Sequence, residues 1–483
     1  MRPLHANAAH AIGAIVLFTA LVLGIAACGS HEGRTAAADF ALKNPGLDAV
    51  ELDALIRRYV GDKQLIGLSV GVMREGRVVL IQGYGLRSQE TREPVTPETM
   101  FAIGSVTKQF TCAAVLLLQQ DGKLSIDDRV AKYEHSLTGA RDITLLDLGQ
   151  HVAGWPDYYP LDFVDRRMAQ ARPVDEILRE YAAQPLEFAP RTRWSYSNTG
   201  YLFLGRVVER MSDMGFGRFV DRRIFQPLQM RHTVYELQRD DPRAAQGYTS
   251  FGFGEPEPAT PEGAGWIGGA GGLWSTPGDL LTWSLALMDR KLLNASSYGT
   301  MTTPRRLPDG RSSGYGCGLG LVDKGPALVL SHGGGVSGFS TRVAMVPATR
   351  SALVLMANRD FASLEALREA ILKKLLPQGD VPIIKGPAAY DAVRMFLREL
   401  REGKVNRANL GEEFSAYLTD ARIASAATTL RRDEATGFEQ PELSERGGME
   451  VARIRFKLGV TPAQGLMYRT PDGKIQQFLF YPA

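Results

Sequence analysis

Two kinds of hydrophobic spacing alternate along the chain. Apolar residues fill 68–73 and 78–83 on either side of Glu75-Gly76, which predicts two antiparallel strands joined by a tight turn. From about residue 110 to 292 the spacing is that of helices separated by Gly and Pro turns. Strand-like segments return at 314–322, 327–331, 339–346 and 352–357, and an amphipathic helix with Leu364, Leu367, Ile371 and Leu375 follows. This order predicts an α+β fold with one antiparallel sheet built from both ends of the region and a helical insertion beside it.

The pattern changes again beyond Pro377. Residues 377–387 are typical of a linker, and a helix follows whose apolar face carries Val393, Phe396, Leu397 and Leu400. Strand-like segments then lie at 451–458, 466–469 and 475–481. We therefore expect a principal domain at residues 45–376 and a small α+β accessory domain at residues 388–483. No pair of residues in the accessory domain suggests chemistry, which favours a packing or regulatory role.

The first 28 residues differ from the rest. Arg2 precedes an uncharged stretch at 11–27, which is shorter than the roughly 20 residues of a spanning helix and ends at Cys28. Small residues before Cys28 resemble a bacterial lipobox, whose cysteine becomes the lipid-modified first residue of the mature protein. We expect a lipoprotein-type export signal at 1–28, a tether at 29–44 and a periplasmic protein held to the outer membrane by lipid. A plain membrane anchor or an unmodified export signal is the alternative.

Composition narrows the range of partners. The chain has 483 residues, of which 44% are hydrophobic and 23% charged, as in folded globular proteins. Its net charge of +3 and the absence of a Lys/Arg block argue against a nucleic-acid partner, and no oligomeric state is indicated. No His/Cys cluster indicates a metal, and no cofactor is expected. Cys112 and Cys317 are expected to be small buried residues. An exported protein could pair them, but nothing in the sequence argues for a disulfide, and we expect them to be unpaired.

Three short motifs carry candidate chemistry. Ser105-Val106-Thr107-Lys108 opens a predicted helix, and its hydroxyl and amine, three residues apart, lie on one helical face. Tyr196-Ser197-Asn198 precedes a helix predicted at 201–211. His332-Gly333-Gly334 lies where one predicted strand ends and the chain begins to approach the next strand. Each motif alone is more often a cap, a turn or a loop, and their meaning depends on their order.

In this order the motifs resemble those of the penicillin-recognising serine hydrolases, the branch of class C β-lactamases, D,D-peptidases, D-aminopeptidases and related esterases. The resemblance covers residues 45–376 and includes the segments 148–154, 188–190 and 269–276. It implies a β-lactamase/transpeptidase-like fold. It also implies a serine hydrolase that forms an acyl-enzyme with a small-molecule or peptide substrate, such as an ester, an amide or a D-amino-acid peptide.

The resemblance assigns the catalytic roles to two of the motifs. Ser105 is the expected nucleophile, and Lys108 takes its proton if burial lowers the amine's pKa from about 10.4 to near 7. Tyr196 is expected to relay the proton to the leaving group. Asn198 is expected to donate its amide to the substrate and to position Lys108.

The third motif departs from the family pattern. His332, Gly333 and Gly334 stand where β-lactamases have Lys-Thr-Gly, so a fixed charge and a hydroxyl that bind the substrate carboxylate are absent. This version resembles the D-aminopeptidase and esterase members more closely. The backbone N–H of Gly335, with that of Ser105, is the expected oxyanion donor. Arg191, where the family usually has Gly, alters the loop before Tyr196.

Other interpretations stay open at this point. The protein could be a true class C-type β-lactamase or a D,D-carboxypeptidase. It could also be a non-hydrolytic, membrane-tethered sensor of cell-wall ligands. Residues 67–71 match a nucleophile elbow around Ser69, but that motif needs a helix after the turn and here a strand continues. Residues 333–338 match a dinucleotide motif, yet a strand follows them as well.

Overall fold

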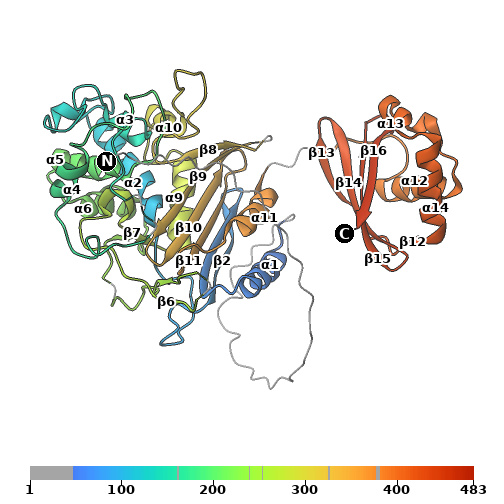
Figure 1. Ribbon diagram of the computed structural model, residues 1–483, viewed down its shortest axis with the longest axis horizontal. Helices are drawn as coiled ribbons and strands as arrows, with labels where there is room; N and C mark the ends of the chain where they lie inside the picture. Colours follow the sequence, from blue (N-terminus) through green and yellow to red (C-terminus); the bar gives the residue numbers. More distant parts are fainter. Residues whose placement is uncertain are drawn as a thin grey trace, which may run out of the picture. The chain divides into compact units, whose positions relative to one another are not determined.

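The computed structural model (Figure 1) describes residues 47–159, 161, 163–238, 240–252, 254–324, 327–376 and 381–482. The predicted export signal, the tether and Cys28 lie outside these residues, as do the first four residues of the predicted linker. Among the residues described, no helix has the length and apolar character required to cross a membrane.

A six-stranded antiparallel sheet lies at the centre of the N-terminal part, in the order β2-β1-β11-β10-β9-β8. Its strands are β1 (Gly67–Arg74), β2 (Arg77–Gly85), β8 (Gly320–Asp323), β9 (Leu328–Val336), β10 (Phe339–Val346) and β11 (Ser351–Ala357). β1 pairs with β11, with Leu68 opposite Ala357, so the two ends of this part meet in the middle of the sheet. The predicted antiparallel sheet is thereby confirmed.

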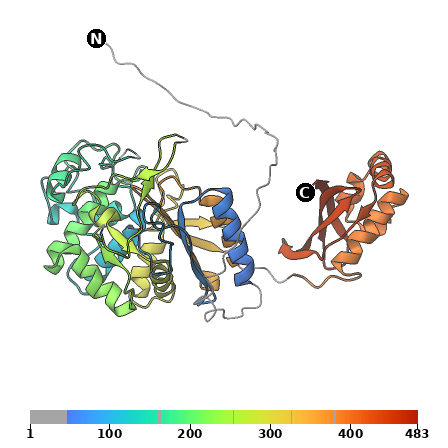
Figure 2. The same ribbon diagram turned by 90° about the horizontal axis from the view of Figure 1, so that it is seen from below.

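Both faces of the sheet are covered, which explains why β11 is buried along its whole length. Helices α1 (Ala49–Asp62) and α11 (Glu365–Leu375) pack on one face, as Figure 2 shows, around a cluster that includes Val329 and Ala344. The helical insertion packs on the other face, around a larger cluster that includes Leu330 and Val343. Because side chains alternate along a strand, successive residues of β9 and of β10 pack on opposite faces of the sheet.

The insertion surrounds one central helix, α2. Residues 107–118 of α2 are all buried, which explains its continuous apolar run. The helices are α2 (Thr107–Gln120), α3 (Leu145–Gly149), α4 (Val174–Tyr181), α5 (Asn198–Ser212), α6 (Phe216–Val220), α7 (Gln226–Leu228), α8 (Gly268–Gly271), α9 (Pro277–Met288) and α10 (Ala295–Thr302). Short strands β3 (Phe101–Ala102), β7 (Leu273–Ser275) and β4 (Val234–Tyr235) form one small sheet, and β5 (Tyr248–Thr249) and β6 (Glu257–Pro258) form another.

The segment before β8 differs from its prediction. Only Gly320–Asp323 is a strand, whereas residues 314–319 form an irregular loop with bends. Gly318 has a φ of +76°, and a Cβ at this position would lie 2.6 Å from the backbone oxygen of Lys108. The glycines therefore let this loop pack directly against α2 and do not form a regular strand.

The cysteines correct a second prediction. Cys112 on α2 and Cys317 in this loop form a disulfide, with their Cα atoms 5.8 Å apart, and both are fully buried. The close approach of the loop to α2 brings the two sulfur atoms together although 205 residues separate them in sequence. The expectation of two unpaired cysteines was therefore wrong.

Arg191 shows how the chain accommodates its departure from the family pattern. Its φ is +69°, a left-handed conformation that costs a non-glycine residue of order 1 kcal/mol. Its Nη1 donates to Oδ2 of Asp147 at 2.7 Å, and Arg305 donates to Oδ1 at 3.0 Å. Asp147 is itself buried and caps α3 together with Thr144. The ion pair with Asp147 thus fixes the Arg191 side chain against α3.

Asp147→Ala should destabilise the domain by about 3 kcal/mol, because it leaves two arginines without their buried partner and removes the helix cap. Urea unfolding followed by circular dichroism measures this change. The matched control is Asp309→Ala, which removes an exposed pair with Arg311 and should leave the midpoint unchanged. Equal midpoints for the two variants would contradict the prediction.

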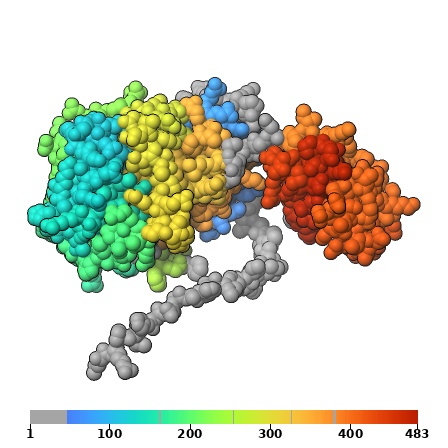
Figure 3. Space-filling view, turned by 90° about the horizontal axis from the view of Figure 1, so that it is seen from above, coloured from blue at the N-terminus to red at the C-terminus, as the bar shows by residue number. Residues whose placement is uncertain are grey.

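The C-terminal part (orange to red in Figure 3) has a hydrophobic cluster of its own. Its sheet contains β12 (Ala435–Thr436), β13 (Glu442–Arg446), β14 (Met449–Leu458), β15 (Thr461–Arg469) and β16 (Ile475–Pro482), and its helices are α12 (Ala389–Glu402), α13 (Glu412–Tyr417) and α14 (Asp420–Arg432). α14 was not predicted, because its apolar positions are few. Arg469 and Glu450 form a buried ion pair, and Arg469 also donates to the backbone oxygen of Pro387 at 2.7 Å.

Candidate active site

Glycines bring the Ser105 turn against strand β9. Ser105 lies in the single turn η1 (Gly104–Val106), which leads directly into α2. A Cβ on Gly334 would lie 1.9 Å from the backbone oxygen of Ile103, and one on Gly104 would lie 2.9 Å from the backbone nitrogen of Gly335. Side chains at these two glycines would therefore force the turn and the strand apart. The expected oxyanion donors, Ser105 and Gly335, belong to segments in direct contact.

Lys108 is held beside the Ser105 hydroxyl. Its Nζ lies 2.9 Å from Ser105 Oγ, 2.7 Å from Asn198 Oδ1 and 2.8 Å from the backbone oxygen of Ala270. The side chain is fully buried, and this burial lowers the pKa of Lys108 to about 7, although the nearby Asp157 carboxylate acts in the opposite direction. A substantial fraction of the amine is therefore neutral near pH 7 and able to accept a proton.

Tyr196 lies over the same amine. Its ring centroid is 4.9 Å from Lys108 Nζ, and its hydroxyl is hydrogen-bonded to Ser105. Burial raises the pKa of Tyr196 well above its ordinary value, so it stays protonated at neutral pH. His151 stacks on the ring with centroids 4.3 Å apart and accepts a hydrogen bond from the Ser197 N–H at Nδ1. Tyr196 is thus held between contacts with Lys108, His151 and Ser105.

Asp157 is a site residue that the sequence analysis missed. Asn198 donates from Nδ2 to both carboxylate oxygens of Asp157, at 3.2 and 3.1 Å, while its Oδ1 accepts from Lys108. Asn198 therefore positions Lys108 and is itself held by Asp157, while its expected donation to a substrate stays a prediction. A single aspartate in a loop has no pattern that marks it in the sequence.

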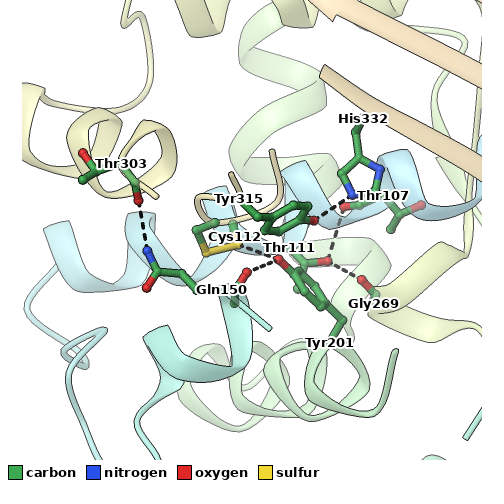
Figure 4. The surroundings of a disulfide bond; sticks show 11 residues. Thr107, Thr111, Cys112, Gln150, Tyr201, Gly269, Thr303, Tyr315 and His332 are labelled. Carbon is green, nitrogen blue, oxygen red and sulfur yellow. Dashed lines mark hydrogen bonds between the residues drawn. A yellow bond between two sulfur atoms is a disulfide. The ribbon is translucent and has the colours of Figure 1, made fainter. Parts of the chain in front are cut away.

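His332 is brought to the site in a neutral form. Its Nδ1 lies 2.6 Å from the backbone oxygen of Gly333 and must carry the proton, so Nε2 accepts from the Tyr315 hydroxyl at 2.7 Å. Figure 4 shows this pair beside the disulfide. Burial and the charge of Lys108 lower the pKa of His332 to about 3. His332 therefore supplies no positive charge for a substrate carboxylate at neutral pH.

A cavity of about 450 Å³ runs along the glycine stretch of β9. It is lined by Tyr159, Phe163, Val164, Thr249, Thr260, Gly333, Gly334, Gly335, Val336, Ser337, Phe339, Ser340, Arg342, Asp360 and Phe361. β8 pairs with β9 only as far as Ser331, so β8 leaves the β9 edge beside this cavity unpaired. An extended substrate can therefore lie along β9 and reach the oxyanion donors.

The nucleophile-elbow and dinucleotide motifs do not lie on the elements that their functions require. Ser69 is buried in the middle of β1, between residues paired on both sides, and not at a strand-to-helix turn. The stretch 333–338 runs into strand β10, not into a helix. In the part of the chain that the structure describes, no group of three or more His, Cys, Asp or Glu side chains is placed to hold a metal ion.

Comparison with known proteins places this geometry in a family. A model of the family described as Beta-lactamase matches residues 52–376. The chain belongs to the β-lactamase family. A D-aminopeptidase from Gluconobacter oxydans is 26% identical, in a match that covers 64% of this chain and 58% of that protein. A D-aminopeptidase from Brucella ovis is also 26% identical, with 80% of this chain and 77% of that protein covered.

One solved structure has a similar fold over most of the chain. The octameric penicillin-binding protein homologue from Pyrococcus abyssi matches with a TM-score of 0.59 and 21% identity, and the match covers 90% of this chain and 96% of that one. The expected β-lactamase/transpeptidase-like α+β fold is therefore confirmed. The chain spans less than two thirds of the length of the Gluconobacter relative.

Proposed function

We propose that this member of the β-lactamase family is a serine hydrolase that forms an acyl-enzyme at Ser105. One observation carries the proposal: the buried Lys108 amine lies 2.9 Å from Ser105 Oγ, and burial lowers its pKa to about 7. A lysine with its ordinary pKa would be protonated and could not act as a base. A surface lysine three residues after a serine would have neither property.

The reaction proceeds in two transfers. Neutral Lys108 takes the Ser105 proton while Oγ attacks the substrate carbonyl, and the N–H groups of Ser105 and Gly335 stabilise the oxyanion. The bond to the leaving group breaks, and the leaving group receives a proton through Tyr196. Water then attacks the ester on Ser105, which releases the acid and returns a proton to Oγ. Asn198 and Asp157 hold the Lys108 amine in place throughout.

The proposed substrates are amides, peptides or esters, with D-amino-acid derivatives favoured. The two D-aminopeptidases among the relatives support this class. The neutral His332 supports it as well, because β-lactamases and D,D-peptidases bind a substrate carboxylate with a charged residue at this place. D-aminopeptidase activity is therefore favoured over β-lactam hydrolysis.

A fluorophosphonate probe and a substrate panel test this proposal. The probe should label the wild-type protein, and peptide mass spectrometry should locate the label on Ser105. The panel consists of p-nitrophenyl acetate, D-alanine p-nitroanilide and nitrocefin, with turnover expected for the first two. Label on another residue would overturn the assignment. Label on Ser105 without turnover of any panel member would favour the non-hydrolytic sensor instead.

We further propose that the protein is exported and anchored by lipid on Cys28. The apolar segment that ends in a small-residue lipobox supports this localisation. The disulfide between Cys112 and Cys317 supports it as well, because disulfides persist mainly in oxidising compartments such as the bacterial periplasm.

Cys28→Ser should abolish lipid attachment, because serine has no thiol for the thioether bond. Cells grown with an alkyne-tagged fatty acid should give a labelled wild-type protein and an unlabelled variant. The labelled protein should fractionate with the outer membrane. Equal labelling of the two proteins would contradict anchoring at Cys28.

A further inference from the structure

The cavity beside β9 has a charged group on its wall that the proposed reaction does not use. Arg342 of β10 lies opposite Gly333 of β9 in the strand register, and both line the cavity. Both residues face the layer of α11, whereas His332 and Gly334 face the helical insertion with Leu330. A substrate on the β9 edge would therefore meet Ser105 on one side and Arg342 on the other.

The guanidinium of Arg342 occupies the space above Gly333. A Cβ on Gly333 would lie 3.4 Å from Nη1 of Arg342, so the missing side chain leaves room for this group. Nε donates to Oε1 of Glu365 at 2.7 Å, and Nη1 donates to the backbone oxygen of Thr341 at 2.9 Å. Nη2 has no hydrogen-bond partner among the residues that the structure describes. A guanidinium has five N–H donors, so three remain for a ligand.

The rest of the cavity wall combines apolar side chains with hydroxyl groups. Phe163 and Phe361 line the cavity and are 64% and 69% exposed, so they offer apolar surface to a ligand there. The other charged wall residue, Asp360, is already engaged, because it accepts hydrogen bonds from the Thr249 side chain and the Gly338 N–H. The cavity thus combines apolar walls with one partly available cation, which is the chemistry that recognises a carboxylate beside an apolar side chain.

We propose that Arg342 binds a carboxylate of the substrate and replaces the charge and the hydroxyl that are missing at His332 and Gly333. This inference rests on the proposed acyl-transfer function and makes peptides that end in a free carboxylate next to an apolar side chain its preferred substrates. Guanidinium and carboxylate can pair through two parallel hydrogen bonds, so the site selects a planar anion over a neutral amide. Arg342 is then a specificity-determining residue of the same active site.

Matched dipeptides test this role. Wild type and Arg342→Gln are compared on D-alanyl-D-phenylalanine and on its carboxamide, which differ only in the terminal charge. The variant should lower kcat/KM for the acid about 10- to 100-fold and change that for the carboxamide less than threefold. Arg342→Lys, which keeps the charge, should recover part of the loss. An equal effect on both dipeptides, or none on either, would overturn the proposal.

Two further measurements distinguish the role of Arg342 in binding from the proposed hydrolase function. Arg368→Gln is the matched control, because Arg368 also donates to Glu365 but does not line the cavity, and it should leave both dipeptides unaffected. Turnover of the carboxamide by the wild type reports on the proposed hydrolase function itself. Calorimetric titration of the Ser105→Ala variant, with and without Arg342→Gln, measures binding without turnover. A Kd for the acid that is unchanged by Arg342→Gln would overturn the role of Arg342 even if no hydrolysis occurred.

Discussion

Ser105→Ala should lower kcat/KM for p-nitrophenyl acetate and for D-alanine p-nitroanilide by about 10⁴-fold or more. The physical reason is that Ser105 Oγ is the only hydroxyl hydrogen-bonded to the Lys108 amine among the described residues. The loss removes the attacking atom itself, so positioning and oxyanion stabilisation alone cannot compensate. Steady-state kinetics and loss of fluorophosphonate labelling measure the effect.

Ser69→Ala is the matched control for this prediction. Ser69 is the serine of the rival nucleophile-elbow motif, and it is buried in β1, where its hydroxyl has no hydrogen-bond partner among the residues that the structure describes. Its replacement should leave labelling and turnover within threefold of wild type. If Ser69→Ala abolished labelling while Ser105→Ala retained it, the active site would have to be placed elsewhere. Thermal unfolding of both variants shows whether either change acts through the fold.

Lys108→Met should lower the acylation rate by about 10³-fold, the contribution of a general base. Methionine fills the buried space of the lysine but cannot accept the Ser105 proton. Lys108→Arg tests the same point with the charge retained, because a guanidinium does not deprotonate at accessible pH. Stopped-flow measurement of acyl-enzyme formation is the readout, with the half-exposed Lys132→Met as the surface control. Near-normal acylation in both Lys108 variants would show that another base operates.

The pH dependence of acylation tests the role of Lys108 as the base independently. Burial lowers the pKa of Lys108 to about 7, and only the neutral amine accepts a proton, so acylation should rise with pH through about 7 and then level off. The pKa of His332 is lowered to about 3 and that of His151 also lies well below its ordinary value, so neither explains a break near 7. Lys108→Met should remove the break.

Asp157 sets where this break occurs. Its carboxylate favours the charged form of Lys108 and therefore raises the amine's pKa against the effect of burial. Asp157→Asn removes that charge and should move the break to lower pH, because the amine then loses its proton more readily. A break that moved to higher pH, or did not move, would show that Asp157 acts only through the Asn198 hydrogen bonds.

The strands and the central helix could be predicted because they have a local cause. The hairpin of β1 and β2 and the strand β10 appear in the spacing of apolar residues, since burial on a sheet imposes it directly. The segment 314–319 was predicted wrongly because its glycines serve a close approach to α2, which a local pattern cannot distinguish from a strand. α14 was missed because much of its surface is exposed.

The candidate site also contains residues that the sequence predicted and residues that it did not. Ser105 and Lys108 are neighbours on one helical turn, so their proximity follows from helix geometry, and the order of the three motifs indicates the family. Asp157, Tyr315 and Arg342 have no such signal, because each reaches the site from a distant segment and is a common residue in its own context.

The sequence by itself therefore determined the fold class and the proximity of Ser105 and Lys108, since the first depends on periodicity and the second on residues a single turn apart. Only the tertiary structure decided the disulfide between Cys112 and Cys317, the neutral state of His332 and the place of Arg342 above Gly333. The physical reason is that these features depend on contacts and burial between segments far apart in the chain. Desolvation of the Lys108 amine was also decided by the tertiary structure, because it depends on the segments that pack around α2.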